Sequence, residues 1–312
     1  MDVSFQTQYS SPMTRREFLV AAAGSVCVLA GLNGCSTVRN SQPANLVGSG
    51  LYGWTQYYSR EGRNANDHMD EVLSAVRDCG YAFLEGFIDL QHPEKCARLA
   101  EQSRAKGLKP VSIYVTAPMH EQAKAENSVA RLVDAARICR QSGFSIINLN
   151  PAPIGRAKTD QELRTQIEAL EKLGTELSKL GLKLGIHNHT PEMVNGAKEF
   201  HYDLRETNPR HVGFCFDVHW VFRGGIKPLD CLHEYGSRVV SWHLRQSRDG
   251  TWWENLDDGD VDYPAVAAFA RQHRMTAPYA VELALENGTK ITRSVVENHR
   301  RSREYVRTVF GC

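Results

Sequence analysis

Short apolar runs alternate with longer amphipathic stretches along the chain from about residue 50 onward. The apolar runs end at Gly, Pro or polar residues, which is typical of buried strands. They span residues 51–54, 81–85, 110–115, 145–149, 182–187, 212–217, 239–244 and 279–283. The stretches with helical spacing of apolar positions span residues 65–79, 93–107, 121–142, 160–180, 195–207, 228–235, 262–274 and 292–309. The pattern therefore predicts eight consecutive strand–helix units.

Eight such units favour an α/β fold with a parallel sheet covered by helices, and above all a single-domain (β/α)8 TIM barrel. Glycines at positions 107, 143 and 181 lie where a predicted helix ends, the position that helix termini favour for Gly. A doubly wound sheet is the main alternative. A dinucleotide-binding sheet would carry a Gly-x-Gly-x-x-Gly motif after its first strand, and none follows the run at 51–54; the same spacing at residues 48–53 begins before that run and overlaps it.

Composition narrows the class of protein further. The 312 residues include 37 Lys and Arg against 36 Asp and Glu, for a formal net charge of +1. A nucleic-acid-binding protein needs a basic surface, so no nucleic-acid partner is expected. Charged residues make up 23% of the chain and hydrophobic residues 42%, which suits a folded domain rather than a disordered chain.

The first 35 residues have the organisation of an export signal. Arg15 and Arg16 precede an apolar stretch from Leu19 to Leu32, which is too short for a membrane span. The arginine pair resembles the twin-arginine signal and predicts passage through the twin-arginine export machinery. A generic positively charged signal segment is the alternative.

The end of this segment, Leu32-Asn33-Gly34-Cys35, looks like a lipobox and predicts lipidation of Cys35. Asn33 is unusual in such a motif, and the three alanines at 21–23 offer a different cleavage site. The expected organisation is a signal with its lipobox over residues 1–35, a flexible tether over residues 36–49 and a barrel over residues 50–312. The expected location is the periplasm, with a lipid anchor as the only membrane attachment.

Polar and ionisable residues gather where the predicted strands end, the side of a TIM barrel that carries the active site. They are Glu85, Asn148, Asn150, His187, Asn188, His189, Asp217, His219, His243, Arg245 and Glu282, with Glu192 shortly after the fifth strand. A charged group beside an apolar run is costly unless it is paired or binds a metal. Several at the same end of the barrel indicate a functional site.

Imidazole and carboxylate groups together suit a divalent metal such as Mn, Zn, Co or Fe. Because side chains alternate along a strand, His187 and His189 would share one face of the fifth strand, and Asp217 and His219 would share one face of the sixth. Each histidine alone is more often a hydrogen-bonded core residue, and Asp217 alone could be a helix cap. The set as a whole predicts a metal site.

Six segments carry a resemblance to xylose-isomerase-like TIM barrels, the sugar phosphate isomerase/epimerase superfamily. They are residues 80–85, 185–189 with Glu192, 216–219, 243–245, 258–263 and 281–282. The resemblance implies one divalent ion (Mn, Zn, Co, Fe or Mg) with ligands from strands five to eight. By position these ligands are His187, Asp217, His243 and Glu282. The first replaces the family's usual glutamate, and His189 is close enough to take its place.

The resemblance also implies a function. We expect a metal-dependent isomerase or epimerase that acts on a free sugar or keto-sugar through an enediolate, with Glu282, His187 or His189 as the catalytic base. The expected substrate-binding residues are Trp54, Glu85, Asn150, Glu192, His219 and Arg245. The missing strand-five glutamate keeps a lyase of the inosose dehydratase type as a close rival. A non-catalytic sugar-binding lipoprotein is the third alternative.

Overall fold

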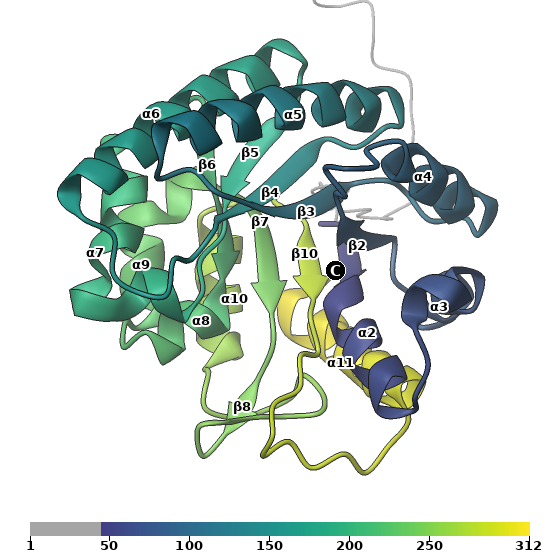
Figure 1. Cartoon of the computed structure of the whole chain (residues 1–312). Coiled ribbons are helices and arrows are strands. Elements are labelled where there is room, and N and C mark those ends of the chain that lie inside the picture. The colour runs from purple at the N-terminus through teal and green to yellow at the C-terminus, as the bar shows by residue number, and fades with distance from the viewer. Residues whose placement is uncertain (1–44) are drawn as a thin grey trace, which may run out of the picture. The chain divides into compact units, whose positions relative to one another are not determined.

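Eight parallel strands pair side by side and close into a barrel (Figure 1). The structure is a computed structural model that describes residues 45–312. Its barrel strands are β1 (Val47–Gly50), β2 (Phe83–Phe87), β3 (Ser112–Ala117), β4 (Ile146–Pro151), β5 (Lys183–Ile186), β6 (Val212–Asp217), β7 (Val239–Leu244) and β10 (Tyr279–Val281). Pairing of Val47 with Tyr279 joins the first strand to the last and closes the ring. The prediction of a single-domain (β/α)8 barrel is confirmed.

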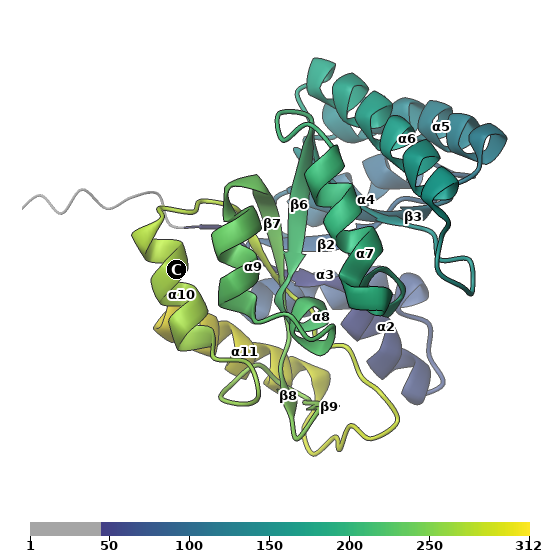
Figure 2. The same ribbon diagram turned by 90° about the vertical axis from the view of Figure 1, so that its left-hand side faces the viewer.

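Helices follow the strands and surround the barrel (Figures 1 and 2). They are α2 (Leu51–Arg60), α3 (Met69–Asp78), α4 (Lys95–Ala105), α5 (Gln122–Gln141), α6 (Asp160–Lys179), α7 (Thr190–Glu206), α8 (Val218–Arg223), α9 (Pro228–Tyr235), α10 (Tyr263–Gln272) and α11 (Val295–Phe310). A small hairpin of β8 (Ser247–Arg248) and β9 (Thr251–Trp252) follows β7. The predicted arginine-pair signal and the Cys35 lipidation site lie outside the described residues.

The first strand is the main correction to the predicted elements. Residues 51–54 form the first turn of α2, so the strand predicted there is wrong, and β1 lies just before it at Val47–Gly50. The barrel therefore begins inside the segment expected to be a tether. This strand has only one large apolar residue, Val47. At Gly48 a side chain is excluded, because a Cβ would lie 2.4 Å from ring atoms of Phe83.

A second correction concerns the ends of β5 and β6. Helix α7 begins at Thr190 rather than near 195, and its backbone breaks from Val194 to Ala197. The chain turns into helix α8 directly after Asp217, whose Oδ1 accepts a hydrogen bond of 2.8 Å from the backbone N–H of Trp220. His219 therefore lies on a helix and does not share a strand face with Asp217.

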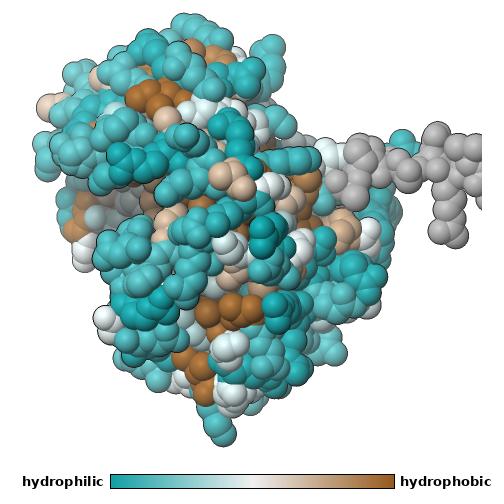
Figure 3. All heavy atoms as spheres, turned by 90° about the vertical axis from the view of Figure 1, so that its right-hand side faces the viewer, coloured by the Kyte–Doolittle hydropathy of each residue, from teal (hydrophilic) through white to brown (hydrophobic). Residues whose placement is uncertain are grey.

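Buried apolar side chains fill the barrel and the layer between its strands and helices. Figure 3 shows one face of the molecule, where hydrophilic residues predominate and hydrophobic residues appear in small separate groups. Within residues 45–312, every helix is too short or too polar to cross a bilayer. This packed frame holds the strand ends that carry the polar residues.

Candidate metal centre

A cavity of about 510 Å3 opens at the carboxyl ends of the barrel strands. It brings together most of the ionisable residues that the sequence placed at strand ends. The expected site residues that line it are Glu85, His187, His189, His243, Arg245 and Glu282. The predicted location of the site at this end of the barrel is therefore consistent with the structure.

Three side chains at this site have the arrangement of metal ligands. One ligand atom each from His187, Asp217 and His243 can be chosen so that all lie within 4.8 Å of one another. The Oδ2 of Asp217 lies 3.4 Å from Nε2 of His187 and 3.9 Å from Nδ1 of His243. Both of these ring nitrogens are buried, and within residues 45–312 neither has a hydrogen-bond partner. Two imidazoles and a carboxylate fit a divalent cation such as Zn, Mn or Fe.

The other ring nitrogen of each histidine is occupied. Nε2 of His243 lies 2.5 Å from Oε1 of Glu85, whose second oxygen accepts a hydrogen bond of 2.8 Å from Asn148. Nδ1 of His187 lies 3.3 Å from Oδ1 of Asn150. Donation to these oxygens leaves the lone pairs of His243 Nδ1 and His187 Nε2 directed at Asp217. Hydrogen bonds of this kind orient metal-binding histidines and fix their tautomers.

Glu282 lies beside this group rather than within it. Its Oε2 is 3.7 Å from Nδ1 of His243, but the same oxygen contacts the guanidinium of Arg245. Arg245 also contacts Oδ2 of Asp217, so its positive charge holds two carboxylates together. The guanidinium carbon lies 5.4 Å and 4.8 Å from the ring centres of Trp220 and Trp252. The structure thus brings Glu282 near the three ligands and pairs it with Arg245.

Burial and neighbouring charges set the protonation of the group. Burial lowers the pKa of His187 to about 4 and that of His189 to about 3, against an ordinary value near 6.5. Burial alone would raise the pKa of Asp217, but Arg245 and His187 outweigh it and hold that pKa well below its usual range. A neutral imidazole and an ionised carboxylate at neutral pH are the forms that bind a metal.

His243 differs from the other histidines. Burial opposes its charged form, yet Cys215 and Glu85 outweigh burial and raise the pKa of His243 well above its ordinary value. The negative surroundings that favour a proton on this imidazole also attract a divalent cation. A proton and a metal ion would therefore compete for Nδ1 of His243.

Three residues expected to touch substrate lie behind the cavity wall. Asn150 holds His187, and Glu192 accepts a hydrogen bond of 2.6 Å from the backbone N–H of His189 at the start of α7. His219 lies on α8 and accepts a hydrogen bond of 3.2 Å from Nε1 of Trp252. These contacts position residues that do line the cavity.

Trp54 is also placed differently from expectation. It lies on α2 with its side chain fully buried, donates a hydrogen bond of 2.9 Å to Ser49 and stacks on His299 at 4.4 Å between ring centres. The structure does not bring it into the cavity. Its expected stacking on a sugar depended on the incorrect first strand, and Trp54 is instead a core packing residue.

The cavity also contains aromatic residues that the sequence reasoning did not identify. These are Tyr52, Phe87, Tyr114, Trp220 and Trp252. The sequence offered a signal for two of them. Tyr114 lies near the end of the run predicted as the third strand, and Trp220 directly follows the Asp217–His219 segment.

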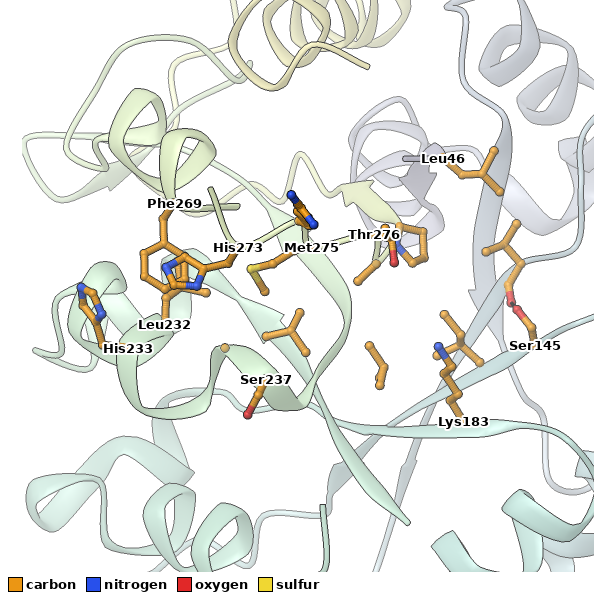
Figure 4. A pocket seen from close by; sticks show the side chains of 18 residues that line it. Leu46, Ser145, Lys183, Leu232, His233, Ser237, Phe269, His273, Met275 and Thr276 are labelled. Atoms are coloured by element: carbon orange, nitrogen blue, oxygen red, sulfur yellow. Dashed lines mark hydrogen bonds between the residues drawn. The ribbon is translucent and has the colours of Figure 1, made fainter. Parts of the chain in front are cut away.

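A larger cavity of about 680 Å3 lies at the opposite, amino-terminal end of the strands (Figure 4). Its ionisable lining residues are Lys183, His233, His273 and Arg274, with no carboxylate among them. In TIM barrels the active site lies at the carboxyl ends of the strands. The smaller cavity, whose lining includes His187 and His243 of the candidate ligand group, is therefore the candidate site.

Comparisons with known proteins agree with this geometry. The model of the family described as "Xylose isomerase-like TIM barrel" matches residues 73–307. Inosose dehydratase 2 of Bacillus cereus is 28% identical over 114 residues, which cover 36% of this chain and 38% of that protein. The chain thus aligns with less than two fifths of the length of this curated relative.

Two solved structures share the fold at lower sequence identity. A sugar phosphate isomerase/epimerase from Parabacteroides distasonis superposes with a TM-score of 0.68 at 19% identity, covering 88% of this chain and 98% of that one. A 3-keto-D-glucoside 4-epimerase from E. coli superposes with a TM-score of 0.64 at 13% identity, covering 84% and 98%. Both therefore support the barrel fold.

Proposed function

Because the chain belongs to the xylose isomerase-like TIM-barrel family, we propose that it is a metal-dependent epimerase or isomerase of keto-sugars. One observation carries this proposal. His187 and His243 line a cavity of about 510 Å3, large enough for a small carbohydrate, and their ring nitrogens Nε2 and Nδ1, which have no hydrogen-bond partner within residues 45–312, converge on the buried Asp217. His187, Asp217 and His243 would hold the ion, with Glu282 adjacent. A divalent cation in this place supplies Lewis-acid stabilisation of the oxyanion that develops on the substrate.

Residues of the chain would supply proton transfer and the positioning of charge. Glu85 also lines the cavity but is committed to His243, so among the lining carboxylates Glu282 is the one placed to accept a proton from the carbon beside the substrate carbonyl. Arg245 holds Glu282 in position and places a positive charge beside the negative charge that develops. His189, which lines the cavity, is the second group placed to exchange a proton with the substrate.

Elimination of water is the second candidate reaction. It is favoured by the similarity to an inosose dehydratase and because Glu282 is the one lining carboxylate that is not paired with a histidine through a hydrogen bond. In this reaction Glu282 removes the proton from the carbon beside the carbonyl, the carbon–oxygen bond at the next carbon breaks, and the proton now on Glu282 passes to the departing hydroxyl, which leaves as water. Both reactions share the first proton transfer, and they differ in whether the substrate loses water.

The test combines metal analysis with proton NMR of keto-sugars in D2O. We expect the wild type to bind one divalent ion and to exchange the proton beside the carbonyl for deuterium. Asp217→Asn should lose the ion, and Glu282→Gln should keep the fold while slowing exchange by about 100-fold or more. Loss of mass equal to water would identify elimination.

Glu234→Gln is the matched control, because Glu234 pairs with Arg205 on the surface. It should behave as the wild type. Undiminished activity and metal content in Asp217→Asn would contradict the proposed site. Sugar binding by a metal-loaded wild type without exchange would indicate a non-catalytic binding protein instead.

A further inference from the structure

Two exposed aromatic side chains lie at the candidate metal cavity. Tyr52 is 41% exposed and Phe87 is 42% exposed, and both line the cavity. Among the large hydrophobic side chains of residues 45–312, Val194 is the only other one that is exposed. Exposed aromatic surface costs free energy in water, and its concentration at a cavity indicates a binding surface. We call Tyr52 and Phe87 the rim pair.

The fold places the rim pair at the carboxyl ends of two adjacent strands. Tyr52 lies in the first turn of α2, directly after β1, and Phe87 is the last residue of β2. The two strands are hydrogen-bonded neighbours, with Gly50 opposite Glu85. The hydroxyl of Tyr52 accepts a hydrogen bond of 3.2 Å from Nε2 of Gln56. The pair therefore belongs to rigid elements rather than to a long loop.

Apolar side chains continue the wall between the rim pair and the interior. Leu51, Ile88 and Val115 line the same cavity and are buried. The charged lining residues, in contrast, gather around Asp217 and the two ligand histidines. The cavity therefore has an ionic base and an apolar, aromatic side.

Tyr114 connects these two regions. Its ring centre lies 5.2 Å from that of His187 and 6.0 Å from that of Phe87, so a single ring separates a ligand histidine from the rim pair. The residue lines the cavity, whereas its hydroxyl is buried and has no hydrogen-bond partner within residues 45–312. A sugar held at the candidate ligand group would lie beside Tyr114. A substituent on that sugar would then reach Phe87.

We propose that the rim pair is a subsite for an apolar aglycone, so that the preferred substrate is a keto-sugar glycoside with an aromatic substituent rather than a free sugar. The inference rests on the proposed function, because it requires the sugar at the ligand group. A free sugar presents hydroxyls to Tyr52 and Phe87 and leaves their rings in contact with water. An aromatic aglycone covers them and removes apolar surface from water.

Phenyl and methyl keto-glucosides are the probes for this subsite. In the wild type, kcat/KM should be higher for the phenyl compound by about tenfold, mainly through KM, because the rim pair binds the ground state and the transition state alike. In the double variant Tyr52→Ala, Phe87→Ala the ratio of the two kcat/KM values should fall to about one. Val194→Ala, an exposed residue outside the cavity lining, should keep the wild-type ratio.

A ratio near one in the wild type, or a ratio that survives in the double variant, would overturn the aglycone subsite. Failure of both compounds to react would count against the proposed function instead. The subsite is then tested alone by saturation-transfer NMR with phenyl and methyl β-D-glucoside. Transfer to the phenyl protons in the wild type, lost in the double variant, supports the subsite, and its absence in the wild type overturns it.

Discussion

At the scale of single residues, the site depends on hydrogen bonds that select one nitrogen of each imidazole. Glu85 and Asn150 occupy the nitrogens of His243 and His187 that point away from Asp217. Neither touches the candidate ligand position itself. Their effect is to direct the other nitrogen of each ring toward one carboxylate, which is the condition for binding a cation between them.

Glu85→Gln tests this role. The amide keeps the size of the side chain but removes the charge that holds His243, so metal affinity should fall by about 10–100-fold. Isothermal titration with Zn2+ and Mn2+ measures the change, and circular dichroism confirms the fold. Glu234→Gln makes the same chemical change on the surface and should leave affinity unaltered. Equal affinity in Glu85→Gln and the wild type would show that His243 needs no such partner.

At the scale of elements, local sequence signals determine where helix α6 begins, and tertiary contacts determine how closely it packs on the barrel. Its start is local: Thr159 accepts a hydrogen bond from the N–H of Glu162, while the Glu162 side chain accepts one from Thr159, a capping box. Its interior is set by packing. A Cβ on Gly174 would lie 2.6 Å from the backbone oxygen of His211, just before β6. Gly174 therefore allows the helix to lie close to the strand that ends in Asp217.

Gly174→Ala should for this reason destabilise the protein. In an open helix this change stabilises by about 1 kcal/mol, but here the clash should reverse the sign and cost about 1–3 kcal/mol. Denaturant unfolding measures the free energy. Ser178→Ala, at an exposed position of the same helix, should be neutral or slightly stabilising. A stabilised Gly174→Ala variant would show that α6 can move away from His211 without cost.

At the scale of the whole molecule, burial of several neutral histidines makes folding sensitive to acid. Burial lowers the pKa of His187 to about 4 and the pKa values of His189, His219 and His299 to about 3. The unfolded chain takes up protons near pH 6.5, whereas these imidazoles resist protonation in the fold. The contribution of these histidines to the free energy of unfolding is therefore complete above pH 6.5 and is lost as the pH falls toward 4. The raised pKa of His243 changes stability only above pH 6.5.

Each such histidine should lower the unfolding free energy by about 2 kcal/mol between pH 7.5 and pH 5. Buried acids with a raised pKa, such as Asp203, act in the opposite direction. The informative quantity is therefore the difference between the wild type and His299→Gln at the two pH values. This variant should lose about 2 kcal/mol of the pH dependence, since His299 lies far from ionic partners and its shift comes from burial alone.

The exposed His92 supplies the control, and His92→Gln should keep the full pH dependence. Denaturant titrations at both pH values give the four free energies needed. If His299→Gln retained the wild-type dependence, the imidazole of His299 would have to become protonated inside the fold. The stacking on Trp54 would then have to accommodate a charge.

The sequence by itself determined the eight-unit barrel and the end of it at which the ionisable residues gather. These features are local: apolar runs, helical spacing and the polar residues that follow each strand are all within a few positions of one another. Asp217 and His243 were recognisable on these grounds. The exception is the first strand, which was predicted at the wrong residues. Its observed position, β1, contains Gly48 where an apolar side chain would have marked a strand.

Only the tertiary structure decided how the polar residues share the site. Glu85 and His243 are 158 positions apart, yet their contact directs one ring nitrogen toward Asp217. The pairing of Arg245 with Glu282, 37 positions apart, and the stacking of Trp54 on His299 also join residues from separate parts of the chain. Side-chain orientation depends on neighbours that the barrel brings together from different strands. The residue types at the strand ends were therefore predictable, and their division into ligands, supports and aromatic wall was not.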